Sequence, residues 1–243
     1  MSMSAIRIGV LGDHDPVGLS THRELDAVLE RLRERGVEGW WVGTDAPEAA
    51  AVGAPGVVDG LWIAPGSPYR DAGAVLGAIG RARRGGVPLL GTCSGFQYAA
   101  LELAVALAGV VDPRHAETDP EAVDPFVAPL ACRVDGERRV VRCAEGTRLA
   151  ELLGTAPFDG VFFCGFAPSE AAVEALERAG VLIGARAEGV GAVALELPGH
   201  PFFLATLFQP QVGAVAGEPL SPVIEAFVAA AARAPSAARV APA

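Results

Sequence analysis

The chain has 243 residues, of which 51% are hydrophobic, and its formal net charge at pH 7 is −10. This length suits one α/β domain with a sizeable core. The acidic balance argues against nucleic acid and anionic membranes as partners, because both attract basic surfaces. All basic side chains are Arg rather than Lys, which excludes a Schiff-base lysine and a phosphate-loop lysine.

The hydropathy pattern and the cysteine spacing bear on where the protein acts and on whether it binds a metal. No apolar run approaches 18 residues and no signal-peptide pattern opens the chain, so we expect a cytoplasmic protein. The four cysteines lack C-x-x-C spacing, which argues against a zinc site and a disulfide framework. We therefore expect neither a metal nor a cofactor.

Strands and helices alternate along most of the chain. The apolar patterns predict strands over 6–11, 39–42, 59–64, 87–90, 160–164, 181–187, 191–197 and 201–208. They predict helices over 20–35, 72–84, 94–109, 149–153, 169–179 and 219–233. Ser20 or Thr21 with Glu24 suggests a capping box, and Asp135-Gly136 suggests a hairpin within 131–142.

This order predicts an α/β fold, a mostly parallel sheet flanked by helices, with an antiparallel excursion in the second half. We expect one domain over residues 1–233 and a disordered tail over 234–243. Ligands of such sheets bind at the carboxyl ends of the strands. The loops after the predicted strands are therefore where we expect a site.

One stretch has the layout of a nucleophile elbow. The apolar run ending at Leu90 is followed by Gly91-Thr92-Cys93-Ser94-Gly95 and then at once by a helical pattern. Such a strand–turn–helix holds one side chain up at the turn, next to the N–H groups that begin the helix. Those groups favour a thiolate and stabilise an oxyanion, so Cys93 is a candidate nucleophile.

Three segments together resemble the class I glutamine amidotransferases. They are the elbow 91–97, the upstream Ala64-Pro65-Gly66-Ser67, and the downstream run 200–210, His-Pro-Phe-Phe-Leu-Ala-Thr-Leu-Phe-Gln-Pro. Within that family the chain is most similar to the glutaminase domain of CTP synthase and its stand-alone CTP-synthase-like relatives. The resemblance extends from about Ile6 to Val228 and implies a single amidotransferase-like domain.

The resemblance implies roles for individual residues. Cys93 would attack the side-chain amide of glutamine, forming a thioester and releasing ammonia. The backbone N–H groups of Gly66 and Ser94 would form the oxyanion hole. Gln97 and Glu117 would hold the substrate, with Glu117 facing its ammonium group.

The chain departs from the family at two positions of the site. The family's catalytic His-Pro-Glu is here Gln209-Pro210-Gln211, and an amide has no useful basicity at neutral pH. Gln209 is therefore assigned to substrate binding. The arginine that binds the substrate carboxylate in CTP synthase falls near Cys164, where residues 162–166 contain no basic side chain. A synthetase domain and a phosphate-binding glycine loop are not expected either.

The missing base leaves four histidines to consider. His115 lies two residues before Glu117, so an extended backbone would direct both side chains to one side. His115 is therefore the first candidate for a base, against the alternative of a hydrogen-bonded structural histidine. His14 and His22 flank the loop after the first strand and could approach the same rim, whereas His200 fits a structural position.

Three functions remain open at this point. The first is a Cys93-dependent hydrolase or transferase acting on an amide or related C–N bond of a small molecule. The second is a non-catalytic binding or regulatory protein that has kept the pocket. The third is a glutaminase subunit that needs an ammonia-accepting partner. The residues also leave a homo-oligomer open.

Overall fold

The computed structural model describes residues 5–234. Within this range nine strands form one sheet in the order β2-β1-β3-β4-β9-β8-β7-β5-β6. The strands are β1 (Ile6–Leu11), β2 (Val37–Val42), β3 (Gly60–Ile63), β4 (Leu89–Thr92), β5 (Val127–Cys143), β6 (Phe158–Pro168), β7 (Leu182–Ala187), β8 (Gly191–Glu196) and β9 (Phe203–Thr206). The helices are α1 (Ser20–Arg33), the 3₁₀ turn η1 (Pro47–Ala50), α2 (Ala72–Gly85), α3 (Ser94–Ala106), α4 (Arg148–Leu153), α5 (Glu170–Arg178) and α6 (Pro222–Arg233).

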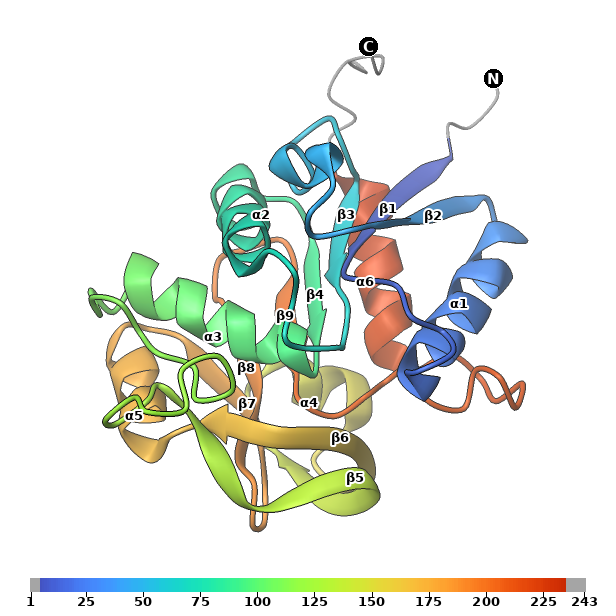
Figure 1. Ribbon diagram of the computed structural model, residues 1–243. Coiled ribbons are helices and arrows are strands. Elements are labelled where there is room, and N and C mark those ends of the chain that lie inside the picture. The colour runs from blue at the N-terminus through green and yellow to red at the C-terminus, as the bar shows by residue number, and fades with distance from the viewer. Residues whose placement is uncertain (1–4, 235–243) are drawn as a thin grey trace.

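The sheet has a parallel half and an antiparallel half. Strands β2, β1, β3, β4 and β9 run parallel to their neighbours, whereas β9, β8, β7, β5 and β6 pair antiparallel. Helices α1 and α6 lie on one side of the parallel half, and α2 and α3 lie on the other (Figure 1). The predicted fold class is confirmed.

The strands beneath the site are hydrophobic because both faces of this half are covered. All four residues of β3 and all four of β4 are buried. Helix α3 is buried at every position from Ser94 to Leu103, which agrees with its nearly continuous apolar sequence. The core therefore continues on both sides of β4 and supports the turn that follows it.

Two sequence predictions are wrong. Residues 131–142 do not form a hairpin, because β5 runs without a turn and pairs with both β6 and β7. Gly136, with φ at 69°, lies at a register shift of that strand, so the left-handed residue makes a bulge instead. The capping box also fails, since the cap residue of α1 is Leu19 and no side chain caps it.

Glu24 has a different contact. Its carboxylate accepts a hydrogen bond of 2.8 Å from the backbone N–H of Val215. The same helix donates from Arg31 to the carbonyl of Glu218 at 2.6 Å. Helix α1 therefore holds the loop that follows Gln211.

Among the helices of residues 5–234, none combines the length and apolar character needed to cross a membrane. The predicted tail at 234–243 lies, apart from Ala234, outside the described residues. The domain limit at residue 233 stays a prediction.

Candidate active site

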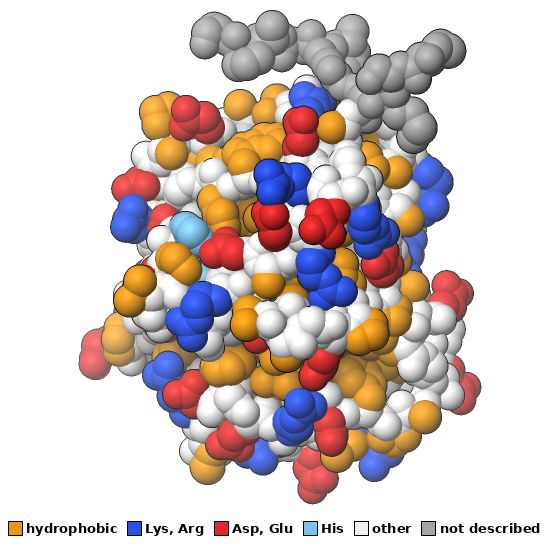
Figure 2. All heavy atoms as spheres, turned by 90° about the vertical axis from the view of Figure 1, so that its right-hand side faces the viewer, with side chains coloured by type: hydrophobic (Ala, Val, Ile, Leu, Met, Phe, Trp, Pro, Cys, Tyr) orange, Lys and Arg blue, Asp and Glu red, His pale blue; other side chains and the backbone are white. Residues whose placement is uncertain are grey.

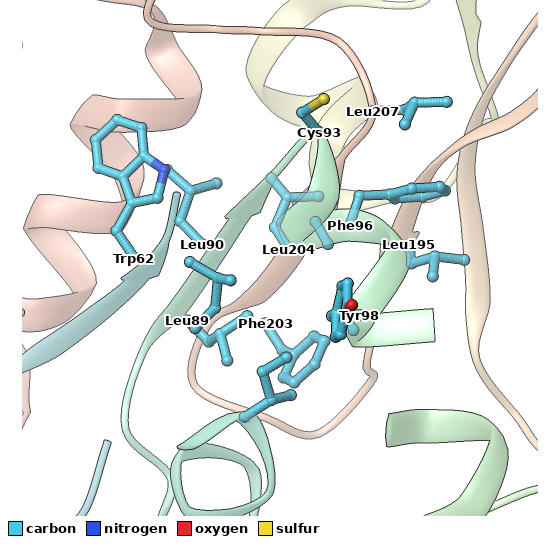
Figure 3. Packing of buried hydrophobic residues seen from close by; sticks show 14 of the residues in the cluster. Trp62, Leu89, Leu90, Cys93, Phe96, Tyr98, Leu195, Phe203, Leu204 and Leu207 are labelled. Atoms are coloured by element: carbon cyan, nitrogen blue, oxygen red, sulfur yellow. The ribbon is translucent and has the colours of Figure 1, made fainter. Parts of the chain in front are cut away.

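Cys93 lies in the turn between β4 and α3 and has a backbone conformation rare for a residue with a side chain. Its φ is 53° and its ψ is −109°. A Cβ at Gly91 would lie 2.8 Å from the carbonyl oxygen of Gly95, and a Cβ at Gly95 would collide with the backbone of Ile63. Glycine is thus required on both sides of the turn. In Figure 3 the sulfur points away from the packed side chains of Leu90 and Leu204.

The backbone N–H groups of two residues near Cys93 are candidate donors to a bound group. They belong to Gly66, in the loop after β3, and to Ser94, the first residue of α3. Gly66 has φ at 102°, in the region that favours glycine. Gly66, Ser94 and Cys93 line the same cavity, which has a volume of about 190 Å³. The structure thus brings Gly66 and Ser94, the two residues predicted to supply oxyanion donors, to the cavity of Cys93.

The thiol of Cys93 is almost completely buried. Burial raises its pKa to about 11, and the Glu117 carboxylate acts in the same direction. The backbone and side chain of Ser94 and the side chain of Gln209 act to lower this pKa, but they do not offset the burial. Cys93 is therefore a neutral thiol at pH 7.

Gln209 and Gln211 are joined to each other. Gln211 Nε2 donates to Gln209 Oε1 at 2.6 Å, and both side chains are buried. Gln209 Nε2 and Gln211 Oε1 have no hydrogen-bond partner in the described chain. Gln209 lines the cavity together with Cys93, and its side chain acts to lower the pKa of the thiol. An amide pair of this kind can donate to a bound group but cannot take a proton from the thiol.

His115 belongs to a second hydrogen-bonded chain. Its Nδ1 accepts from the backbone N–H of Glu117 at 3.1 Å, which places its proton on Nε2. Nε2 then donates to Gln97 Oε1 at 3.1 Å, and Gln97 Nε2 donates to the carbonyl of Phe166 at 2.8 Å. Burial lowers the pKa of His115 to about 4. Both nitrogens are thus occupied without a bond to the sulfur, and a base role for His115 stays a prediction that these contacts do not favour.

The charged side chains of the cavity come from two separate segments. Glu117 follows α3 and presents a buried Oε2 that has no partner in the described chain. Arg133 comes from β5, and its stem passes over Gly165, whose missing Cβ would lie 3.6 Å from Arg133 Cγ. Arg133 is exposed, and Asp135, two residues further along β5, lines the same cavity. Sequence reasoning missed Arg133, because only the pairing of β5 with β6 brings it beside Cys164.

Two further histidines have hydrogen-bond partners away from Cys93, and a second cysteine lies in the cavity. His14 pairs with Asp26 at 2.9 Å, and His200 bonds the carbonyl of Ala82 at 3.2 Å. Cys164 also lines the cavity, and burial raises its pKa. Residues 5–234 contain no cluster of three or more His, Cys, Asp or Glu side chains that could hold a metal ion.

The chain matches proteins named CTP synthase in sequence. It is 34% identical over 186 residues to CTP synthase of Aeropyrum pernix, a match that covers 72% of this chain and 34% of that protein. It is 33% identical over 231 residues to CTP synthase of Thermobifida fusca, covering 84% of this chain and 42% of that protein. The chain thus spans less than half the length of these curated relatives. No family model matches it.

Solved structures share the fold. The glutaminase domain of Trypanosoma brucei CTPS, solved with bound acivicin, superposes with a TM-score of 0.77 at 21% identity, over 96% of this chain and 97% of that one. A glutamine amidotransferase from Thermotoga maritima superposes with a TM-score of 0.57 at 12% identity, over 93% and 81% of the two chains. The chain is therefore a relative of the class I glutamine amidotransferases. Within that class, its sequence matches place it beside the glutaminase domain of CTP synthase.

Proposed function

We propose that this chain is a Cys93-dependent enzyme that hydrolyses or transfers the amide C–N bond of a small molecule with an amino-acid head group. The observation that carries the proposal is the position of Cys93. Its thiol lies at a strained strand-to-helix turn, in one cavity with Gly66 and Ser94, whose backbone N–H groups are candidate oxyanion donors. Backbone strain of this kind costs about 1–3 kcal/mol and tends to persist where function needs it.

The chemistry follows from these groups. The sulfur attacks the carbonyl carbon, and the N–H groups of Gly66 and Ser94 receive the negative charge that develops on the oxygen. The C–N bond then breaks, the proton from the thiol ends on the leaving nitrogen, and a thioester remains. Water or an acceptor amine cleaves the thioester and restores the thiol.

Charged side chains that line the cavity, those of Glu117, Arg133 and Asp135, support an amino-acid head group, which carries charges of both signs. The unpartnered Oε2 of Glu117 suits an ammonium group, because a buried carboxylate oxygen without a donor is costly. Arg133 supplies a guanidinium that suits a carboxylate. Gln97 and Gln209 line the same cavity and supply polar side chains, among them the Gln209 Nε2 that has no partner in the described chain.

A second candidate is a non-catalytic protein that binds such a molecule. The observation in its favour is the neutral thiol of Cys93, whose pKa is raised to about 11 in a site where Gln209 offers no basic nitrogen. A binding protein needs the cavity and its charges but not a reactive sulfur.

Acivicin, which is bound in the Trypanosoma brucei neighbour, separates the two candidates. We expect incubation at pH 8.5 to add one acivicin-derived mass to the peptide that contains Cys93, and Cys93→Ser to abolish it. Glutamine should slow this labelling by competing for the cavity. Reversible binding of acivicin without covalent mass would favour the binding protein, and no binding at all would contradict both candidates.

A further inference from the structure

His22 is a fully buried histidine directly behind the loop that carries Gly66. It lies in the first turn of α1 and has 0% of its surface exposed. A Cβ at Gly66 would lie 3.2 Å from His22 Nε2, so the ring is in close contact with the backbone of that loop. The cavity wall at Gly66 therefore rests on this imidazole.

The two contacts of the ring define its tautomer. Nδ1 accepts a hydrogen bond of 2.9 Å from the backbone N–H of Asp15, so it carries no proton. The proton is therefore on Nε2, which donates to the carbonyl oxygen of Pro65 at 2.8 Å. His14, Asp26 and Asp15 are the titratable groups nearest to the ring, and burial lowers the pKa of His22. His22 is thus a neutral donor to a single carbonyl.

This carbonyl belongs to the peptide unit whose N–H is that of Gly66. The peptide bond is trans, so its carbonyl and its N–H point in opposite directions. With the oxygen held toward His22, the N–H of Gly66 is directed away from the ring. The preceding carbonyl, that of Ala64, accepts from the hydroxyl of Tyr69, so the loop is held on both sides of Pro65.

We propose that His22 is a positioning residue that holds the Pro65–Gly66 peptide so that the Gly66 N–H serves as an oxyanion donor to chemistry at Cys93. This inference rests on the proposed function. Glycine is the residue most free to rotate about its backbone, so the peptide needs an external contact to keep one orientation. Without the His22 contact, rotation of the peptide would replace the donor by a carbonyl oxygen.

His200 provides a matched control. It is also a buried histidine, with Nδ1 accepting from the backbone N–H of Phe202 at 3.3 Å and Nε2 donating to the carbonyl of Ala82 at 3.2 Å. It does not line the cavity of Cys93. Replacing His200 should lower the stability of the fold about as much as replacing His22 does. It should leave the oxyanion donors unchanged.

The test compares two reactions of the same sulfur. p-Nitrophenyl acetate acylates a thiol through a tetrahedral oxyanion, whereas iodoacetamide alkylates it without one. Both reactions are followed at pH 8.5 by mass spectrometry of the peptide that contains Cys93. The background signal of the Cys93→Ala variant is subtracted. We expect His22→Leu to lower the acylation rate about 100-fold, the typical effect of losing one oxyanion donor. The alkylation rate should stay within about twofold, because the position of the sulfur is unchanged.

Two further variants keep the result interpretable. His22→Gln retains an N–H donor for the carbonyl of Pro65 and should recover most of the acylation rate. His200→Leu should leave both rates as they are, at a similar loss of thermal stability. Acylation that is equally fast in His22→Leu and the unaltered chain overturns the inference alone. Acylation that never occurs at Cys93 in the unaltered chain overturns the proposed function and the inference together.

Discussion

At the residue scale, the position and the ionisation of Cys93 have opposite effects on its reactivity. The turn places the sulfur in a cavity that Gly66 and Ser94 also line, but burial raises the pKa of the thiol to about 11. Roughly one molecule in ten thousand then carries the thiolate at pH 7, and the thiolate is the nucleophile. Geometry therefore prepares Cys93 for attack, while its protonation state holds the rate down.

The rate of Cys93 alkylation should accordingly rise with pH. We expect about a tenfold increase per pH unit between pH 7 and 10, because the fraction of thiolate grows by that factor below the pKa. Iodoacetamide labelling followed by peptide mass spectrometry measures this, with the exposed Cys132 as an internal comparison. A plateau near pH 9 would mean that the pKa of Cys93 is not raised.

Replacing Gln209 by histidine and Gln211 by glutamate should supply the missing base and make the Cys93 thiol more reactive at pH 7. Gln211 donates to Gln209, and Gln209 lines the cavity of Cys93, which is the order that a Glu–His–Cys relay needs. We expect Gln209→His with Gln211→Glu to speed labelling of Cys93 at pH 7 by about 100-fold, a usual gain from a positioned base. Gln211→Glu alone is the control and should give no such gain.

His115 should make stability depend on pH. Its pKa is lowered to about 4 by burial, so the folded chain favours the neutral ring. The stabilisation from this residue is complete above pH 6.5 and is lost as the pH falls from 6.5 toward 4. Between pH 7.5 and 4.5 we expect His115→Gln to lose about 2 kcal/mol less unfolding free energy than the unaltered chain in urea titrations. Equal losses would show that His115 does not titrate in this way.

At the element scale, the site depends on how closely α3 approaches the sheet. The first turn of α3 packs against β3 and β4 through Gly95, which has no room for a side chain. Because α3 also bonds β6 through Gln97, its position connects the two halves of the sheet. In Figure 1, β5 and β6 cross below the carboxyl ends of β3 and β4.

Gly95→Ala should therefore be destabilising. The new Cβ would collide with the backbone of Ile63, which cannot yield as a flexible side chain can. We expect a loss of about 2–3 kcal/mol, typical of overpacking. Gly77→Ala is the matched control within a helix, since its nearest neighbour is the flexible Arg81 side chain, and it should stabilise by up to ~1 kcal/mol. Urea denaturation of both variants provides the measurement.

At the scale of the whole molecule, the antiparallel half of the sheet completes the cavity that the parallel half begins. Strands β5 and β6 bring Arg133 and Cys164 over the carboxyl edge of β4. On the side of the molecule where α1 lies, basic and acidic side chains are interspersed among apolar ones (Figure 2). Arg35, two residues after the end of α1, pairs with Glu225 of α6 at 2.8 Å.

Arg133 should contribute to binding and not to the reactivity of the thiol. We expect Arg133→Met to weaken acivicin labelling of Cys93 about tenfold, because one charge-assisted contact to a carboxylate is lost. Iodoacetamide labelling should not change. Arg138→Met, on the same strand but outside the cavity, is the control. Equal acivicin rates in both variants would remove Arg133 from the proposed site.

The sequence by itself determined the class of fold and the strand–turn–helix around Cys93. Both depend on local signals: alternating apolar segments specify strands and helices, and two glycines flank a turn in which a Cβ would clash. The sequence also showed that Gln209 and Gln211 offer no base, since this follows from residue type alone. It did not reveal Arg133 or the bulge at Gly136, because strand pairing over a long separation decides both.

Tertiary structure decided what surrounds the thiol. Burial of Cys93 raises its pKa, and no local pattern measures how much of the chain covers a side chain. The contacts of His115 with Gln97, and of His22 with Pro65, join residues 18 and 43 positions apart. Such contacts exist only when separate elements meet, so the sequence could name these histidines as candidates but could not assign what they touch.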